Sequence, residues 1–276
     1  DVQRGGPSTG LPTKSEQTDL LQVLFGRNGE SPMPVVAASS PTDCFDAAYL
    51  ACKIALEHMT PVVLLTDAYI ANGSAAWRLP DLNTYPSICP PYVKPEMAGS
   101  WTPFQRDPQT GVRYWATPGT PGFMHRIGGL EKSNETGAIS TEPENHFLMT
   151  KLRAEKVEKI ADSLPPLTVE GNPDADLLIV GFGGTYGHLH SAMDQLNAMG
   201  KKTALAHFRV INPLPKNTAE IQDHRGGRRK YGTAGRFSPP ESGRYSPASV
   251  QSGKRPAVRS ERAGRGFQST FLMIHQ

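Results

Sequence analysis

A strand–helix–strand pattern in the first quarter of the chain most constrains its fold. An apolar run at residues 34–38 precedes a segment at 43–59 whose apolar side chains recur at helical spacing, and Pro61 ends that segment. A second apolar run follows at residues 62–65. Two buried strands joined by a helix are paired in parallel. The pattern therefore predicts an α/β domain built on a parallel sheet.

The same pattern recurs later in the chain. Residues 176–181 form an apolar strand, a glycine-rich turn at 181–187 leads into a helix, and residues 203–206 form the next strand. Glycine amides at a helix N-terminus can bind a phosphate. However, the spacing departs from the dinucleotide fingerprint and no acidic residue follows the second strand. A tight structural turn is the interpretation that we favour.

A proline-, glycine- and aromatic-rich stretch at residues 80–145 separates the two patterns. It is too long for a simple linker and too aromatic for a disordered segment. We expect an ordered excursion that packs against a partner or covers a site, followed by an amphipathic helix at 146–164. Arg113, His125 and Arg126 are candidates to meet an anionic cofactor, although solvated surface charges are the favoured interpretation.

The first thirteen residues combine one cation with several glycines, prolines and hydroxyls. The guanidinium of Arg4 suits a carboxylate, and the hydroxyls of Ser8 and Thr9 add hydrogen-bond donors. Gly6 allows close approach of the backbone and Pro7 stiffens it. The composition fits a structured anion-binding loop, and the alternative is a frayed chain end.

Residues 3–13 (QRGGPSTGLPT) closely resemble the α subunit of 2-oxoacid:ferredoxin oxidoreductases, above all the 2-oxoglutarate type. Further matching motifs follow in the same order, as far as about residue 221. The resemblance implies part of the pyrimidine-side domain of a thiamine diphosphate enzyme over residues 1–165. An incomplete transketolase C-terminal-like α/β domain follows over 166–221. The further motifs lie at 26–30, 41–45, 60–67, 118–120, 144–146, 153–156 and 183–187.

This resemblance also implies an activity, the oxidative decarboxylation of a 2-oxoacid to an acyl-CoA with electrons passed to ferredoxin. Thiamine diphosphate and an iron–sulfur cluster would be held mainly by a partner β subunit, and coenzyme A would be the co-substrate. Arg4 would pair with the 2-oxoacid carboxylate, and Gly6, Pro7, Ser8 and Thr9 would shape the pocket. The family's glutamate that activates the aminopyrimidine has no counterpart here. We therefore expect a fragment that begins after that part and is inactive alone.

Two other functions remain open. One is the β chain of a thiamine-dependent 2-oxoacid dehydrogenase, against which the loop at residues 3–13 argues. The other is a non-catalytic scaffold with a tail that binds nucleic acid or another polyanion. Residues 222–276 carry eleven Lys and Arg against three acidic residues, a net charge of +8. We expect this tail to be disordered or the product of a frameshift, which would leave the second unit with a lone strand pair.

Composition excludes several other classes of protein. No apolar run reaches the roughly 18 residues of a membrane span, and no signal peptide opens the chain, so we expect a cytoplasmic location. Cys44, Cys52 and Cys89 have neither metal-site spacing nor an even count, which predicts reduced, buried thiols and no metal site. The chain lacks an initiator methionine, from which we expect the natural start to lie upstream.

Overall fold

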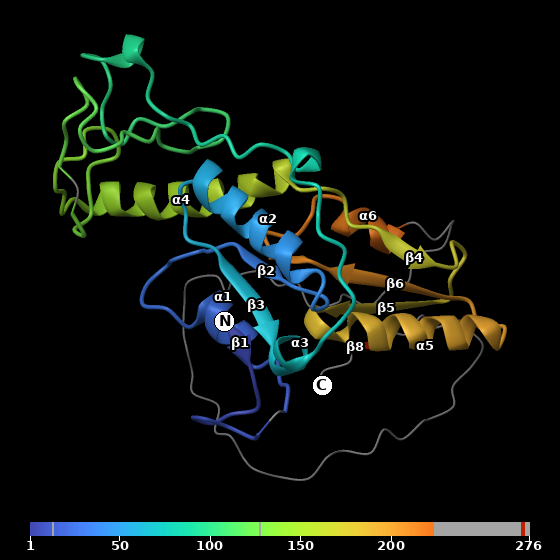
Figure 1. Ribbon diagram of the computed structural model, residues 1–276. Coiled ribbons are helices and arrows are strands. Elements are labelled where there is room, and N and C mark those ends of the chain that lie inside the picture. The colour runs from blue at the N-terminus through green and yellow to red at the C-terminus, as the bar shows by residue number, and fades with distance from the viewer. Residues whose placement is uncertain (13, 127, 224–271, 274–276) are drawn as a thin grey trace.

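The computed structural model describes residues 1–12, 14–126, 128–223 and 272–273, and within these residues the strands form two four-stranded sheets (Figure 1). The first sheet contains three parallel strands and one antiparallel edge strand. This arrangement confirms the predicted parallel α/β sheet. In spatial order its strands are β1 (Val2–Gln3), β3 (Val63–Asp67), β2 (Val35–Ala37) and the antiparallel β7 (Val210–Asn212).

Helices cover both faces of the first sheet. Side chains alternate along a strand, so Val36 packs with α2 (Cys44–Glu57), whereas Val35 packs with α1 (Asp19–Phe25). Helix α2 lies close to the predicted 43–59, and α1 was not predicted. The result is a three-layer arrangement with the apolar strand residues at its centre.

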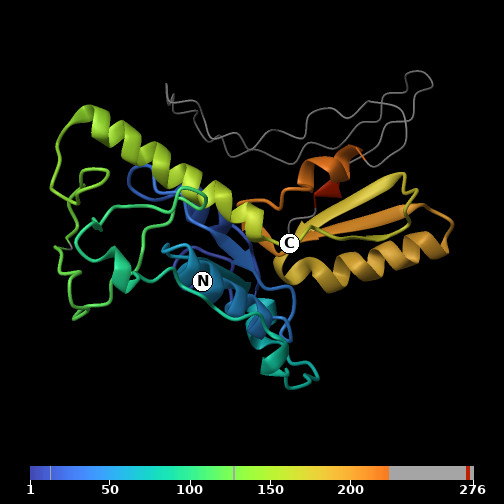
Figure 2. The same cartoon turned by 90° about the horizontal axis from the view of Figure 1, so that it is seen from above.

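The second sheet lies beside the first and is covered by α5 (Tyr186–Ala198) (Figure 2). Leu189 and Met193 of α5 pack against Ile179 and Leu205 of the central strands. The predicted strands β5 (Leu177–Phe182) and β6 (Thr203–Phe208) are confirmed. The expectation of a lone strand pair is wrong, because β4 (Val169–Gly171) pairs with β6 and β8 (Leu272–Met273) pairs with β5.

The chain returns from the second sheet to the first through β7. This strand lies within the range 166–221 predicted for the second unit, yet it pairs antiparallel with β2. Beside it, Arg209 forms an ion pair with the buried carboxylate of Asp43, and Asn212 Nδ2 donates to the carbonyl of Met33 over 2.7 Å. The two units are therefore joined by sheet hydrogen bonds as well as by covalent connections.

Most of the predicted tail at residues 222–276 lies outside the described residues. The described parts are the end of α6 (Thr218–Asp223) and β8. The interpretations of the tail as disordered, frameshifted or polyanion-binding therefore remain predictions.

The excursion at residues 80–145 is ordered where the structure describes it and lies along α4 (Pro143–Lys159) (Figure 2). Its aromatic side chains pack on one another, with the rings of Trp101 and Phe123 centred 5.5 Å apart. Helix α4 matches the helix predicted at 146–164 and continues into a 3-10 turn. The 3-10 turns of this region are η1 (Leu82–Thr84), η2 (Pro95–Met97) and η3 (Ile160–Ser163).

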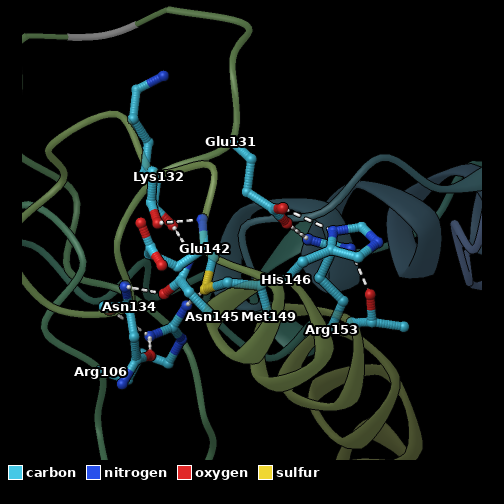
Figure 3. Close-up of polar contacts among 11 residues, drawn as sticks. Arg106, Glu131, Lys132, Asn134, Glu142, Asn145, His146, Met149 and Arg153 are labelled. Carbon is cyan, nitrogen blue, oxygen red and sulfur yellow. Dashed lines mark hydrogen bonds and ion pairs between the residues drawn. The ribbon is translucent and has the colours of Figure 1, made fainter.

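Polar side chains fasten the excursion to α4 (Figure 3). His146 Nδ1 lies 2.6 Å from one carboxylate oxygen of Glu131, and Arg153 lies 3.3 Å from the other. The hydrogen bond from His146, more than any other contact, lowers the pKa of Glu131. Asn145 bonds the backbone of Lys132 and Asn134. The motif residues Asn145, His146 and Arg153 thus have structural contacts that hold the loop in place.

Basic side chains also lie inside the excursion. The guanidinium of Arg113 stacks 4.4 Å from the ring centre of Phe104, and burial lowers its pKa. The expectation of a solvated surface charge is therefore wrong for Arg113. Arg126 is exposed as expected, while His125 is half-buried with its ring centred 5.0 Å from that of Trp101.

The three cysteines are free thiols. Cys52 and Cys89 are exposed and Cys44 is half-buried, so the expectation of buried thiols is wrong. Cys52 is an exposed residue of α2, whose buried residues are Ala47, Ala51 and Ile54. Among the helices in the described ranges, none has the length and apolarity that a membrane crossing requires.

Replacing Leu65 by alanine tests the core of the first sheet. Leu65 is 1% exposed, so we expect Leu65→Ala to lower the free energy of unfolding by about 2–5 kcal/mol. Leu79 is 79% exposed, and Leu79→Ala should change the free energy of unfolding by less than about 0.5 kcal/mol. Urea unfolding of both variants measures the difference. Equal effects would contradict the assignment of Leu65 to the core.

The ammonium group of Lys156 should make stability depend on pH. It donates to the carbonyl of Met59 over 2.8 Å, and burial, with Arg113 and Arg106 nearby, lowers its pKa to about 8 from the usual 10.5. Between these values the unfolded chain binds a proton that the folded chain does not bind. The free energy of unfolding should therefore rise by roughly 1.5 kcal/mol from pH 8 to pH 9.5.

Urea titrations of the wild type, Lys156→Met and Lys151→Met at several pH values measure this rise. Lys156→Met should flatten it, whereas Lys151→Met, which removes an exposed ammonium from the same helix, should preserve it. If the increase with pH persists in Lys156→Met, another titrating group causes it.

Candidate functional site

The candidate site begins where β1 ends. Gln3 pairs with Asp67 at the carboxyl end of β3, and the chain then leaves the sheet as the loop over residues 4–12. Backbone hydrogen bonds close this loop on itself, so it is a structured loop and not a frayed end. The Gly5 amide donates to the Lys14 carbonyl over 3.1 Å, and the Leu11 amide donates to the Gly5 carbonyl over 2.7 Å. The Gly10 amide donates to the Pro7 carbonyl over 3.0 Å.

Gly10 is required by the geometry of this loop. Its φ is +71°, in the region that favours glycine, and a Cβ placed on it would lie 1.7 Å from the carbonyl oxygen of Gly5. The loop therefore depends on a glycine at residue 10 for its closure.

The loop forms one wall of a pocket of about 440 Å³. Of the predicted site residues, Arg4 and Thr9 line this pocket. Gly6, Pro7 and Ser8 belong to the same loop but are not among the lining residues. The short helix α3 (Ala68–Asn72) contributes another part of the lining. The full lining is Val2, Arg4, Thr9, Gly10, Leu11, Pro12, Ala68 and Asn72.

The pocket lining combines one positively charged side chain with polar and apolar residues. Arg4 is its charged lining residue, and no described residue forms an ion pair with Arg4 in the structure. Hydrogen-bonding groups come from Thr9 and Asn72, and apolar surface comes from residues such as Leu11. The arrangement suits a small anion, because a guanidinium binds a carboxylate through two parallel hydrogen bonds.

Helix α3, including Asn72, was not predicted from the sequence. Asp67 caps this helix, because its Oδ1 accepts from the amide of Ile70 over 2.9 Å. The signal that would have found the helix is this capping aspartate directly after a buried strand. Asn72 follows on the last turn of the helix.

The glycine turn of the second unit also meets Asp67. The amide of Gly184 donates to Asp67 Oδ2 over 3.1 Å, and a Cβ on Gly184 would lie 2.3 Å from that oxygen. Gly184 belongs to the 3-10 turn η4 (Gly183–Thr185) that precedes α5. This amide is thus bound within the chain, which favours the structural turn over a phosphate site.

Within the described ranges, no cluster of three or more His, Cys, Asp or Glu side chains is placed to hold a metal ion. The pocket lining contains no carboxylate to bond an aminopyrimidine ring. The pocket's side chains therefore do not fit thiamine diphosphate itself, and they fit a carboxylate-bearing ligand better.

The fold and the loop define a domain of the thiamine-dependent oxidoreductases. The chain belongs to the family described as pyruvate flavodoxin/ferredoxin oxidoreductase, thiamine diphosphate-binding, which matches residues 1–144. This match confirms the predicted family and fold class.

Individual relatives extend the similarity beyond that domain. The chain is 51% identical over 222 residues to the 2-oxoglutarate oxidoreductase subunit KorA of Mycobacterium tuberculosis. It is 33% identical over 218 residues to the α subunit of 2-oxoacid:ferredoxin oxidoreductase 1 of Aeropyrum pernix. These matches cover 80% and 78% of this chain and 33% of each relative. The chain thus spans about a third of the length of these relatives.

A solved structure shows the same arrangement. The 2-oxoglutarate:ferredoxin oxidoreductase of Magnetococcus marinus, with 2-oxoglutarate, coenzyme A and succinyl-CoA bound, superposes with a TM-score of 0.72 at 31% identity. The match covers 81% of this chain and 38% of that one.

Replacing Gly10 by alanine tests the loop. We expect Gly10→Ala to lower the free energy of unfolding by about 1–3 kcal/mol and to speed amide exchange in residues 5–12, because both its φ and the Gly5 carbonyl oppose a Cβ. Gly29 is the matched control, since its φ is +68° but a Cβ there meets nothing within 4 Å. Gly29→Ala should leave the loop's exchange unchanged. Equal exchange in both variants would contradict the role of the Gly5 carbonyl.

Proposed function

We propose that the chain is part of the α subunit of a 2-oxoacid:ferredoxin oxidoreductase, of the 2-oxoglutarate type. The proposed reaction is the oxidative decarboxylation of the 2-oxoacid to an acyl-CoA, with electrons passed to ferredoxin. One observation supports it above the others: Arg4 lines a pocket in a domain of this family without a carboxylate partner among the described residues. The 51% identity to a 2-oxoglutarate oxidoreductase subunit favours 2-oxoglutarate among the 2-oxoacids.

In this proposal the chain binds and orients the substrate. The guanidinium of Arg4 holds the 2-oxoacid carboxylate through a charge-assisted bidentate contact that contributes about 1.5–3 kcal/mol. Gly6, Pro7 and Ser8 set the path of the loop, and Thr9 lines the pocket beside Arg4. The apolar part of the lining covers the carbon chain and excludes water. Fixing the carboxylate leaves the 2-oxo carbon as the free reacting end.

Thiamine diphosphate supplies the carbanion chemistry of such enzymes and is held, in this proposal, mainly by residues outside the described pocket. The absence of a carboxylate from the lining supports this division. We assign the iron–sulfur cluster to a partner β subunit, because the described part of this chain places no cysteine cluster.

The proposed partners are a β subunit, ferredoxin, the 2-oxoacid and coenzyme A, in the cytoplasm. The alternative of a thiamine-dependent dehydrogenase β chain is less well supported, because the relatives named above are oxidoreductase α subunits. The scaffold with a polyanion-binding tail depends on residues outside the described ranges, and it remains a prediction.

Kinetics of the assembled enzyme test the role of Arg4. In the full α–β oxidoreductase, we expect Arg4→Ala to raise the KM for 2-oxoglutarate by about one to two orders of magnitude. Arg4→Lys keeps the charge but loses the planar guanidinium, so its KM should lie between those of the wild type and Arg4→Ala. Arg126→Ala removes an exposed arginine outside the pocket and should leave KM unchanged. An unchanged KM in Arg4→Ala would remove Arg4 from the substrate site.

A further inference from the structure

The carboxylate of Asp67 connects three parts of the molecule. It stands at the end of β3, where it pairs with Gln3. Gln3 is the residue directly before the loop that carries Arg4. Asp67 also begins α3, and it contacts the glycine turn of the second unit. The side chain is 2% exposed, and within the described part of the chain it takes part in no ion pair.

The two carboxylate oxygens have different partners. Oδ1 accepts from the amide of Ile70, which caps α3, and Oδ2 accepts from the amide of Gly184, 117 residues further along the chain. A buried carboxylate is retained only where hydrogen bonds compensate its lost hydration. Here one of these two bonds comes from the second unit, so the burial of Asp67 depends on contact between the units.

The turn around Gly184 is shaped to admit this carboxylate. A Cβ on Gly184 would lie 2.3 Å from Asp67 Oδ2, so a larger residue cannot occupy this position without displacing the carboxylate. The neighbouring Gly183 has a φ of +62° and packs against the side chain of Gln17, which donates to the Phe182 carbonyl over 3.5 Å. The turn therefore contacts Gln17 of the first unit as well as Asp67 at the end of β3.

The position of α3 decides the shape of the pocket. Ala68 and Asn72 line the same pocket as Arg4, and both belong to this five-residue helix. A single helical turn is not stable on its own, so its position depends on its cap and its contacts. The cap is Asp67, and Asp67 is held from the other side by Gly184.

We propose that Asp67 is a positioning residue that fixes the pocket wall by coupling it to the glycine turn of the second unit. Asp67 does not line the pocket and acts through α3. Movement of the second unit would change the distance between Asn72 and Arg4, and so the affinity for the ligand. The part of this inference that concerns a 2-oxoacid rests on the proposed function.

The variant Asp67→Asn separates the two hydrogen bonds. Asparagine places an acceptor oxygen at only one of the two positions that Oδ1 and Oδ2 occupy, and its NH2 group at the other position cannot accept from an amide. Asparagine is also a good N-cap and has nearly the same volume, so α3 keeps its start. The matched control is Asp81→Asn, since Asp81 is an exposed aspartate that caps the 3-10 turn η1 by accepting from the amide of Asn83 over 3.0 Å.

A second pair of variants approaches the same contact from the other side. Gly184→Ala places a methyl group against the Asp67 carboxylate and should displace α3. Asp67→Ser shortens the side chain while keeping a capping hydroxyl, and it makes room for that methyl group. The double variant Asp67→Ser/Gly184→Ala should therefore partly restore the position of α3 that Gly184→Ala displaces.

Amide hydrogen exchange on the full chain gives the first measurement and needs no activity. In Asp67→Asn we expect exchange at Gly184 to speed up about tenfold, together with faster exchange in the pocket loop at residues 9–12. The Asp81→Asn control should leave both segments unchanged. Unchanged exchange at Gly184 and in the loop of Asp67→Asn would overturn the coupling.

Kinetics of the assembled oxidoreductase give the second measurement. Asp67→Asn should raise the KM for 2-oxoglutarate about three- to tenfold and change kcat by less than about twofold, a split that a loss of folded enzyme does not produce. Faster exchange with an unchanged KM would overturn the positioning role. A wild-type enzyme that turns over no 2-oxoacid would refute the proposed function instead, and the exchange data would still decide the coupling.

Discussion

Parallel pairing of β1 with β3 is the constraint on which the rest of the site depends. Because the strands run in the same direction, their carboxyl ends lie at one edge of the sheet, with Gln3 opposite Asp67. The loop after β1 and helix α3 after β3 therefore leave the sheet together and form the two walls of the pocket. Open α/β sheets bind their ligands at this edge for the same reason. An antiparallel partner would have placed Arg4 at the opposite end of β3.

The two α/β units are not independent. Strand β7 leaves the second sheet and pairs with β2, and the Gly184 amide reaches the carboxylate of Asp67. Both contacts join segments more than a hundred residues apart in sequence. A structural change in the second unit is thus felt at the end of β3, where the pocket begins.

The excursion illustrates how a segment without regular secondary structure is held. Arg113 stacks on Phe104, and the carboxylate of Glu131 bonds His146 and Arg153 on α4. Sequence alone indicated that the segment is ordered, since its aromatic content is too high for a disordered linker. It did not indicate that Arg113 is half-buried, because the partial burial of a cation depends on which ring lies beside it in three dimensions.

The sequence by itself determined the local elements, the family and the candidate loop. Strands β2, β3, β5 and β6 and helices α2, α4 and α5 follow from short-range apolar periodicity, which any window of the chain carries. The residues of the loop at 3–13 are contiguous, so their pattern is visible without a fold. The tertiary structure decided which loop residues line the pocket, that Asn72 lines it together with Arg4, and that Asp67 meets Gly184. These relations join residues distant along the chain through packing and strand pairing, and no local pattern of side chains records them.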